Sequence, residues 1–220
     1  MGEQVTLTAP DGHTLGAWRA GDGPGLVVIQ EIFGVNSHIR NTVDRFAEYG
    51  FTALAPALFD RLGPGLELGY EANDVARGRE LRGQISDEQA LADIAAAIAL
   101  LAGEGRPVAC VGYCWGGYLA WTAATQLDGL AAAVGYYGGG IAKTATATPA
   151  CPVMLHFGEQ DHAIPMSDVQ TIIDAHPEFP VHVYPAGHGF SCDERGSYDQ
   201  ASHELALSRT IPFLQQHLGV

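Results

Sequence analysis

The sequence predicts an α/β fold, with a mostly parallel central sheet covered by helices on both faces. Two continuous apolar runs, Leu26–Ile29 and Val108–Val111, have no polar side chain and no helical spacing, which is typical of strands buried on both faces. Helical patterns alternate with apolar runs along the chain, and strands connected in this way form a parallel sheet. The 220 residues are expected to form one domain, 1–220.

Two edge strands are expected before the first central strand. Val5–Leu7 and Leu15–Trp18 alternate apolar and polar positions, and Asp11-Gly12 between them favours a turn. Gly25–Gln30 contains the continuous apolar run Leu26–Ile29 and predicts a central strand.

A helix and a long loop are expected next. Ser37 is the predicted N-cap of a helix that ends near Tyr49, because apolar residues recur between them at helical spacing. Phe51–Ala55 predicts a further strand, and the segment 56–71, with Pro64 and several glycines, is expected to be irregular. A loop of this length in a compact domain usually has a function.

The remaining elements continue the alternation. Two helices precede the strand that begins at Val108, an Ala-rich helix follows it, and three more apolar strands and a long helix complete the chain. The expected helices are Asn73–Gln84, Asp87–Ala102, Tyr118–Gln126 and Tyr198–Leu218, and the expected strands are Ala131–Tyr137, Val153–Phe157 and Val181–Tyr184.

Charge and hydropathy exclude several classes of partner. The formal net charge of −14 would repel a phosphate backbone or an anionic membrane, so a small-molecule substrate is expected and nucleic acid is not. There is no run of about 18 apolar residues to span a membrane, and Met1–Thr8 lacks the features of a secretion signal. A cytoplasmic location is therefore expected.

The cysteines are expected to be reduced thiols without a metal. Two of the four lie in a predicted central strand and in the turn after it, where disulfides are uncommon. Their spacing differs from that of a zinc knuckle, and no helical pair of histidines lies four residues apart, so no metal site is expected. The four are Cys110, Cys114, Cys151 and Cys192.

One of these cysteines stands between a strand and a helix with glycines on both sides. The segment Gly112-Tyr113-Cys114-Trp115-Gly116 has the Gly-x-Cys-x-Gly pattern of a nucleophile elbow, a strained turn that leaves no room for side chains two residues away. The N-terminus of the following helix would favour the thiolate. A glycine-rich turn with an inert buried cysteine is the alternative.

Two later strand ends supply an acid and a histidine. Asp161 follows the strand Val153–Phe157, and His188 follows Val181–Tyr184. Nucleophile, acid and histidine therefore occur in the chain order of the α/β-hydrolase fold. We expect His188 to act as the base and later the acid for Cys114, and Asp161 to orient its imidazole.

Both assignments have alternatives. Asp161 could cap a helix after Pro165, Glu159 competes with it as the acid, and His188 could stabilise a loop. The other histidines are expected to be structural or exposed. His162 is expected to be only a neighbour of the site, His156 and His182 lie in strands, and His13, His38, His176, His203 and His217 are expected on the surface.

An acidic residue stands directly after the central strand Gly25–Gln30. Glu31 must be solvated or paired there, either as a structural carboxylate bonded to backbone N–H groups or as a group that approaches Cys114 and exchanges its proton. The backbone N–H groups of Ile32 and Trp115 are expected to form an oxyanion hole.

Five motifs resemble the dienelactone hydrolase (carboxymethylenebutenolidase) family. They occur in order over nearly the whole chain, and a cysteine elbow combined with the glutamate motif separates this family from serine esterases. The motifs are Gln30-Glu31-Ile32-Phe33-Gly34-Val35-Asn36, Val111-Gly112-Tyr113-Cys114-Trp115-Gly116-Gly117, Gly135-Tyr136-Tyr137-Gly138, Gly158-Glu159-Gln160-Asp161-His162 and Gly187-His188-Gly189-Phe190.

The resemblance implies an α/β-hydrolase fold and the hydrolysis of a lactone. The best-known reaction of the family opens dienelactone to maleylacetate in the breakdown of chloroaromatic compounds. By resemblance, Cys114 attacks, Glu31 activates it when substrate binds, and His188 and Asp161 complete the triad. The resemblance also implies a monomer and no cofactor.

The chain departs from the family where a substrate carboxylate is held. Family members that act on dienelactone use one arginine before the helix that leads to the elbow strand and another shortly after the catalytic histidine. Arg77 or Arg79 is the candidate for the first, although a solvated helix face explains both equally well. Cys192 occupies the expected place of the second arginine, and Arg195 lies near it but shifted.

Four aromatic side chains are candidates for an apolar pocket wall, with core packing as the alternative. They are Phe33, Trp115, Tyr137 and Phe190.

The leading hypothesis is a cysteine hydrolase that opens lactones or small activated esters through an acyl-enzyme. A broad-specificity carboxylesterase or thioesterase is the alternative among enzymes. Outside that class, a non-catalytic protein that binds a small ligand and a redox-sensing thiol at Cys114 stay open. The complete triad counts against a non-catalytic binding protein.

Overall fold

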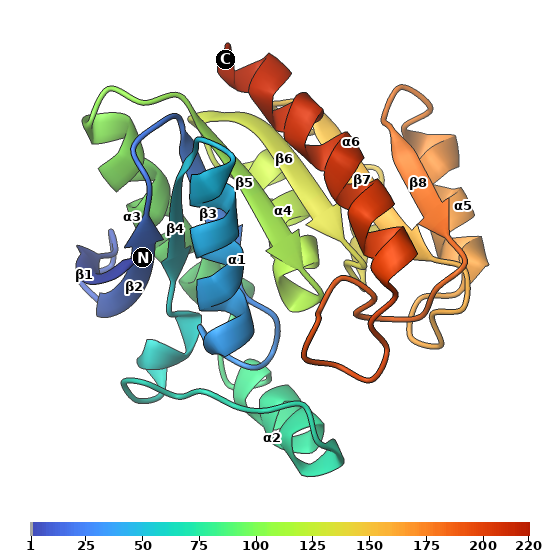
Figure 1. Cartoon of the computed structure of the whole chain (residues 1–220), viewed down its shortest axis with the longest axis horizontal. Coiled ribbons are helices and arrows are strands. Elements are labelled where there is room, and N and C mark those ends of the chain that lie inside the picture. Colours follow the sequence, from blue (N-terminus) through green and yellow to red (C-terminus); the bar gives the residue numbers. More distant parts are fainter. Residues whose placement is uncertain (1) are drawn as a thin grey trace.

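Eight strands form one sheet in the computed structural model, which describes residues 2–220 (Figure 1). The strands are β1 (Glu3–Thr8), β2 (Thr14–Ala20), β3 (Gly25–Ile29), β4 (Thr52–Pro56), β5 (Val108–Tyr113), β6 (Leu130–Tyr136), β7 (Val153–Gly158) and β8 (Val181–Tyr184). Their order is β1-β2-β4-β3-β5-β6-β7-β8, with antiparallel pairing of β2 to both β1 and β4 and parallel pairing elsewhere. The predicted mostly parallel sheet is confirmed.

Helices cover both faces of this sheet. They are α1 (Ser37–Glu48), α2 (Ala72–Arg82), α3 (Asp87–Gly103), α4 (Trp115–Gln126), α5 (Met166–Ala175) and α6 (Gln200–Leu218), with short 3-10 helices η1 (Leu58–Arg61) and η2 (Ile141–Thr144). In Figure 1, α1 and α6 lie in front of the sheet and α3, α4 and α5 behind it, while α2 lies beyond the strand ends. Every residue of β3, β4 and β5 is buried, which explains their continuous apolar sequences.

Three helices begin differently from the prediction. The N-cap of α1 is Asn36 and not Ser37, and α6 follows the N-cap Asp199 and does not begin at Tyr198. In both cases the capping side chain accepts a hydrogen bond from the backbone N–H three residues later. Helix α4 begins at Trp115, three residues earlier than expected, because the turn before it leads directly into the helix.

The loop over 56–71 contains only η1 and folds back on the segment after β3. The Leu68 N–H donates to the Phe33 carbonyl at 2.9 Å, and the Asn36 amide donates to the Leu68 carbonyl at 3.0 Å. A Cβ at Gly34, whose φ is +81°, would lie 2.2 Å from the Leu66 carbonyl. The loop therefore fixes the conformation of the segment that contains Glu31.

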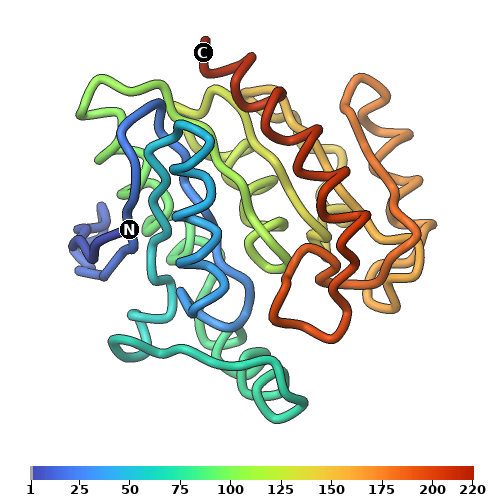
Figure 2. Tube along the Cα trace, in the orientation of Figure 1, coloured from blue at the N-terminus to red at the C-terminus, as the bar shows by residue number. Residues whose placement is uncertain are grey.

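Two segments distant in sequence lie side by side at the carboxyl ends of the parallel strands. Figure 2 shows the blue segment that follows β3 next to the red segment that precedes α6. Ser37 donates to Glu194 at 2.8 Å, and Asp193 contacts both His38 and Arg45.

Two histidines predicted on the surface are buried. His38 is covered by the segment before α6, and His176, at the end of α5, has its Nε2 2.7 Å from the Ala145 carbonyl oxygen. Both predictions were wrong because the covering segments come from distant parts of the chain.

The four cysteines are free. Over residues 2–220, no helix has both the length and the apolar character needed to cross a membrane.

We predict that Gly116→Ala destabilises the fold strongly. A Cβ at this position would lie 2.2 Å from the Ile29 carbonyl and 2.6 Å from the Gln30 carbonyl, and backbone cannot move aside as a side chain can. The free energy of unfolding in urea should fall by about 2–3 kcal/mol. Gly103→Ala is the matched control, because no atom lies within 4 Å of its Cβ, and it should be neutral or stabilising. Equal stability of the two variants would contradict this account.

Candidate active site

Cys114 stands between β5 and α4 in a backbone conformation that side chains rarely adopt. Its φ is 55° and its ψ is −114°. A Cβ at Gly112 would lie 1.9 Å from the Gly116 carbonyl, so α4 approaches β5 more closely than a side chain would permit. The Cys114 N–H donates to the Tyr136 carbonyl of β6 at 3.0 Å, which fixes the turn. The predicted elbow geometry is present.

The structure brings the three predicted triad residues together. Cys114 Sγ lies 3.1 Å from His188 Nε2, and His188 Nδ1 lies 2.7 Å from Asp161 Oδ2. The Asp161 carboxylate is fully buried, and its Oδ1 accepts a hydrogen bond from the Ala163 N–H at 2.8 Å. The carboxylate is thus held by one loop and the imidazole by another, at the ends of β7 and β8.

The two alternatives to Asp161 as the acid, a helix cap and Glu159, do not agree with the structure. Helix α5 begins at Met166 with Pro165 as its N-cap, so Asp161 does not cap it. Glu159, the competing acid, is exposed at the surface.

The surroundings of His188 favour its protonated form. Burial disfavours the imidazolium, but hydrogen bonds to Asp161 and Cys114 outweigh it and raise the pKa of His188 to about 10. His188 Nε2 lies within hydrogen-bond distance of Sγ, and the thiolate is the nucleophilic form of cysteine.

Ile32 and Trp115, the predicted oxyanion-hole residues, line the same pocket as Cys114. Trp115 is the first residue of α4, so its N–H has no partner within the helix. Such an N–H is available to a negatively charged oxygen.

Glu31 is buried and paired with an arginine. Its Oε1 accepts from Arg195 Nη1 at 3.1 Å, and Glu31 raises the pKa of Arg195 against the opposing effect of burial. The guanidinium carbon lies 5.5 Å from the ring centre of Phe33 and 5.9 Å from that of Tyr70. Arg195 therefore reaches the site although Cys192 occupies the position in the sequence where an arginine was expected.

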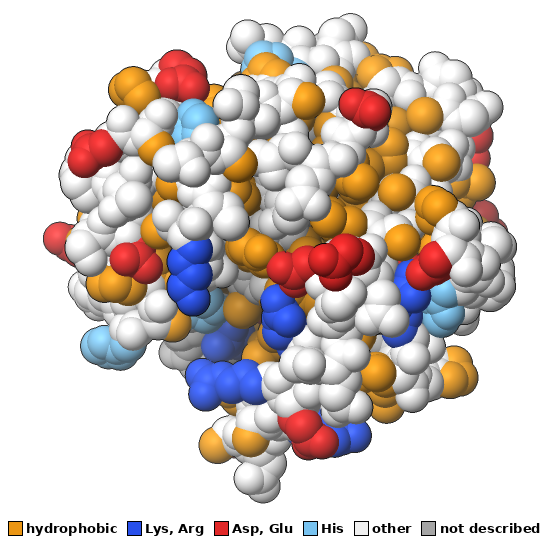
Figure 3. All heavy atoms as spheres, turned by 180° about the vertical axis from the view of Figure 1, so that it is seen from behind, with side chains coloured by type: hydrophobic (Ala, Val, Ile, Leu, Met, Phe, Trp, Pro, Cys, Tyr) orange, Lys and Arg blue, Asp and Glu red, His pale blue; other side chains and the backbone are white. Residues whose placement is uncertain are grey.

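A pocket of about 1140 Å³ opens at Cys114 and His188. Four of the 11 Lys and Arg residues of the chain line it, whereas the buried Asp161 is the only acidic residue among the lining residues. In Figure 3, basic side chains gather in the lower half of the molecule, toward the end where α2 lies in Figure 1. The four basic residues are Arg79, Arg82, Lys143 and Arg195.

Three residues predicted to contact substrate lie outside this pocket. Arg77 is exposed and pairs with Glu80 at 2.7 Å, because the helix directs it to solvent. Tyr137 and Phe190 are fully buried and pack against each other with ring centres 5.3 Å apart. The Tyr137 ring also lies 5.2 Å from the His188 ring, so these two aromatic side chains support the site from the core. Phe33, Trp115, Arg79 and Arg195 do line the pocket.

Sequence reasoning missed three residues of the site. Arg82 lies over the Trp115 ring at 5.4 Å, and its spacing from Arg79 on α2 was a usable signal. Tyr70, in the long loop, and Lys143, in η2, had no signal, because only the folding of their segments places them there. Among the described residues, one group of side chains is close enough to share a metal ion, namely Glu31, His38 and Cys192.

Comparisons with known proteins agree over nearly the whole chain. A sequence model of the dienelactone hydrolase family matches residues 13–218. A Synechocystis sp. protein named "Putative carboxymethylenebutenolidase" is 38% identical over 217 residues, which cover 90% of this chain and 88% of the relative. The carboxymethylenebutenolidase of Pseudomonas putida is 34% identical over 226 residues, which cover 96% and 95%.

A solved structure supports the same relationship. The structure titled "Putative Dienelactone Hydrolase" from Klebsiella pneumoniae subsp. pneumoniae superposes with a TM-score of 0.82 at 28% identity and covers 97% of this chain and 99% of that one. The chain belongs to the dienelactone hydrolase family of hydrolases and has the α/β-hydrolase fold that its sequence predicts.

Proposed function

We propose that this protein hydrolyses a small lactone or activated ester through a cysteine nucleophile and an acyl-enzyme. One observation supports this most directly. Cys114 Sγ lies 3.1 Å from His188 Nε2, and the other ring nitrogen lies 2.7 Å from the buried Asp161 carboxylate.

The reaction would proceed in two steps. The Cys114 sulfur attacks the carbonyl carbon of the substrate, and the resulting oxyanion accepts hydrogen bonds from the backbone N–H groups of Ile32 and Trp115. The leaving oxygen takes a proton from His188, and a thioester to Cys114 remains. His188 then removes a proton from a water molecule, and the hydroxide attacks the thioester carbonyl. The carbon–sulfur bond breaks, which regenerates the Cys114 thiolate and releases the acid product. In both steps Asp161 fixes the orientation of the imidazole and stabilises its charged form.

The pocket favours an anionic substrate. The protein has a formal net charge of −14, yet its pocket lining is basic and includes Arg79 and Arg195. A carboxylate on the substrate would be attracted there and would find a planar guanidinium for bidentate hydrogen bonding. Because two relatives are named carboxymethylenebutenolidase, a lactone with a carboxylate is the first substrate to test.

Glu31 would respond to such a substrate. Its Oε1 is held by Arg195, and a substrate carboxylate that bound Arg195 would compete for the same guanidinium. Release of Glu31 would leave a buried carboxylate available to exchange a proton with Cys114, as the family resemblance implies.

We predict that Cys114→Ala lowers kcat by at least about 10³-fold with dienelactone or a nitrophenyl ester, because the nucleophile is lost. Mass spectrometry of the wild type with a slow ester should show one acyl group on Cys114. Cys151→Ala is the matched control and should keep full activity, since this cysteine is buried outside the pocket. Activity of Cys114→Ala equal to that of the control would reject the proposed nucleophile.

The substitution Arg195→Gln is expected to affect substrates with a carboxylate more than neutral substrates. It should lower kcat/KM for a carboxylate-bearing ester by about 10- to 100-fold, and much less for a neutral ester with the same leaving group. Arg77→Gln, at an exposed residue outside the pocket, is the control and should change neither rate. Circular dichroism would establish that Arg195→Gln is folded, and Arg195→Lys, which keeps the charge, should recover part of the loss. An equal loss on both esters would show that Arg195 does not bind a substrate carboxylate.

The His188 imidazole is expected to remain protonated at pH 8 and to titrate near pH 10 in NMR spectra. Since this pKa lies above the ordinary value of 6.5, protonation of His188 stabilises the fold fully below pH 6.5, and the contribution is lost as the pH rises through 10. Asp161→Asn should lower the pKa of His188, because it removes the bonded carboxylate. Asp174→Asn, at an exposed position on α5, should leave it unchanged. A His188 that titrates near 6.5 in the wild type would contradict this reading.

A further inference from the structure

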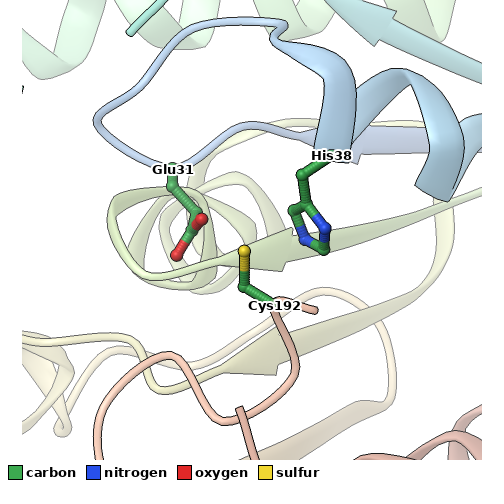
Figure 4. Close-up of side chains that lie close together, drawn as sticks. All are labelled: Glu31, His38 and Cys192. Atoms are coloured by element: carbon green, nitrogen blue, oxygen red, sulfur yellow. The ribbon is translucent and has the colours of Figure 1, made fainter. Parts of the chain in front are cut away.

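Three different metal-ligating side chains, none of which lines the pocket, converge from segments far apart in the sequence (Figure 4). Glu31 follows β3, His38 lies in the first turn of α1, and Cys192 belongs to the loop before α6. One ligand atom from each, a carboxylate oxygen, an imidazole nitrogen and Sγ, lies within 4.8 Å of the other two. The relative exposures are 1%, 2% and 0%, so all three are enclosed by protein.

Two of these side chains present polar atoms without a partner. Glu31 Oε2 and His38 Nε2 are buried and make no hydrogen bond within the described part of the chain. Buried polar atoms are nearly always satisfied, so an oxygen and a nitrogen left unpaired beside a thiol indicate a missing ligand. A carboxylate oxygen has lone pairs suited to a metal ion, and Nε2 has one when the imidazole is neutral with its hydrogen on Nδ1.

The other polar atom of each of these two side chains is held in place. His38 Nδ1 lies 2.9 Å from Asp193 Oδ1, and Arg45 binds the second oxygen of Asp193 at 2.8 Å. Glu31 Oε1 is bound by Arg195. Metal-ligating histidines almost always have a carboxylate or carbonyl on the second ring nitrogen, and ligating carboxylates are hydrogen-bonded in turn. The cluster has both features.

We propose that Glu31 Oε2, His38 Nε2 and Cys192 Sγ form a binding site for a divalent transition-metal ion, with Zn²⁺ as the preferred ion. A thiolate, an imidazole and a carboxylate are the ligand types of zinc, which takes four ligands in a tetrahedron. Three come from the chain, and the fourth position is left for a water molecule.

The charges of such a site balance. Coordination needs the Cys192 thiolate and an unprotonated His38 Nε2, so the thiol proton, and any proton on Nε2, pass to solvent. The thiolate and the Glu31 carboxylate then neutralise the ion. Arg195 stays on Glu31 Oε1, and Asp193 stays between His38 and Arg45. The ion together with its two anionic ligands therefore adds no net charge to the cluster.

The site shares Glu31 with the proposed catalytic machinery. An ion on Oε2 would hold this carboxylate and prevent it from exchanging a proton with Cys114, so the metal-bound protein would open lactones more slowly. This consequence rests on the proposed function, whereas the binding of the ion does not.

The test measures metal binding directly, in the full-length Cys114→Ser variant. That background removes the other pair of sulfur and imidazole, Cys114 and His188, as a competing site. Under reducing, oxygen-free conditions, Co²⁺ should produce a thiolate-to-cobalt charge-transfer band whose intensity saturates at one equivalent of Co²⁺. Zn²⁺ should displace the Co²⁺ and abolish the band. Calorimetry should give a stoichiometry of one for Zn²⁺.

Matched variants locate the ion. Adding Cys192→Ser should abolish the charge-transfer band and weaken Zn²⁺ binding by at least about 100-fold, whereas adding Cys151→Ser should change neither. Asp193→Asn keeps all three ligands and should weaken binding by about 10- to 100-fold through the orientation of His38. If Cys192→Ser does not fold, His38→Gln takes its place and should give the same loss.

Two results would overturn the proposal. One is the absence of a charge-transfer band and of calorimetric binding in the folded Cys114→Ser protein, which would indicate that a water molecule satisfies the cluster. The other is binding that survives both Cys192→Ser and His38→Gln. Loss of esterase activity in Cys114→Ser is expected from the proposed function and does not bear on either result, so the two proposals fail independently.

Discussion

The close approach of α4 to strands β3 and β5 is the constraint on which the site depends. Without a Cβ at Gly112 and Gly116, the helix begins directly after the strand, and Cys114 is held at a positive φ. A residue in such a conformation costs on the order of 1–3 kcal/mol, which the packing of fully buried strands offsets. The same turn directs Sγ toward His188 and places the first residue of the helix in the pocket.

Three ion pairs surround this turn at the carboxyl ends of the strands, and each has one buried member. Asp161 pairs with His188, Glu31 with Arg195, and His38 with Asp193. Each partner makes it less costly to bury the other group, and each pair joins segments distant in sequence. Glu31 takes a central place, because one of its oxygens faces Arg195 and the other has no partner within residues 2–220.

Basic side chains gather around the pocket of an acidic protein. A chain with 25 acidic and 11 basic residues gathers four of the basic ones around one cavity. Two of these, Arg82 and Arg195, lie over aromatic rings, which restrict the orientation of their guanidinium groups. Both already have a carboxylate partner, Asp87 for Arg82 and Glu31 for Arg195, so an anionic ligand would compete with these pairs for the guanidinium groups.

The sequence alone determined the alternation of strands and helices, the elbow at Cys114 and the positions of Asp161 and His188 at strand ends. These features depend on local pattern and chain order, because continuous apolar runs and flanking glycines specify them within a few residues. Three features became visible only in the folded chain: Arg195 reaches Glu31 although Cys192 stands where an arginine was expected, Arg77 faces solvent, and His38 is buried. Each of these depends on which distant segment contacts a side chain, and neither the periodicity nor the spacing of residues in the sequence predicts that contact.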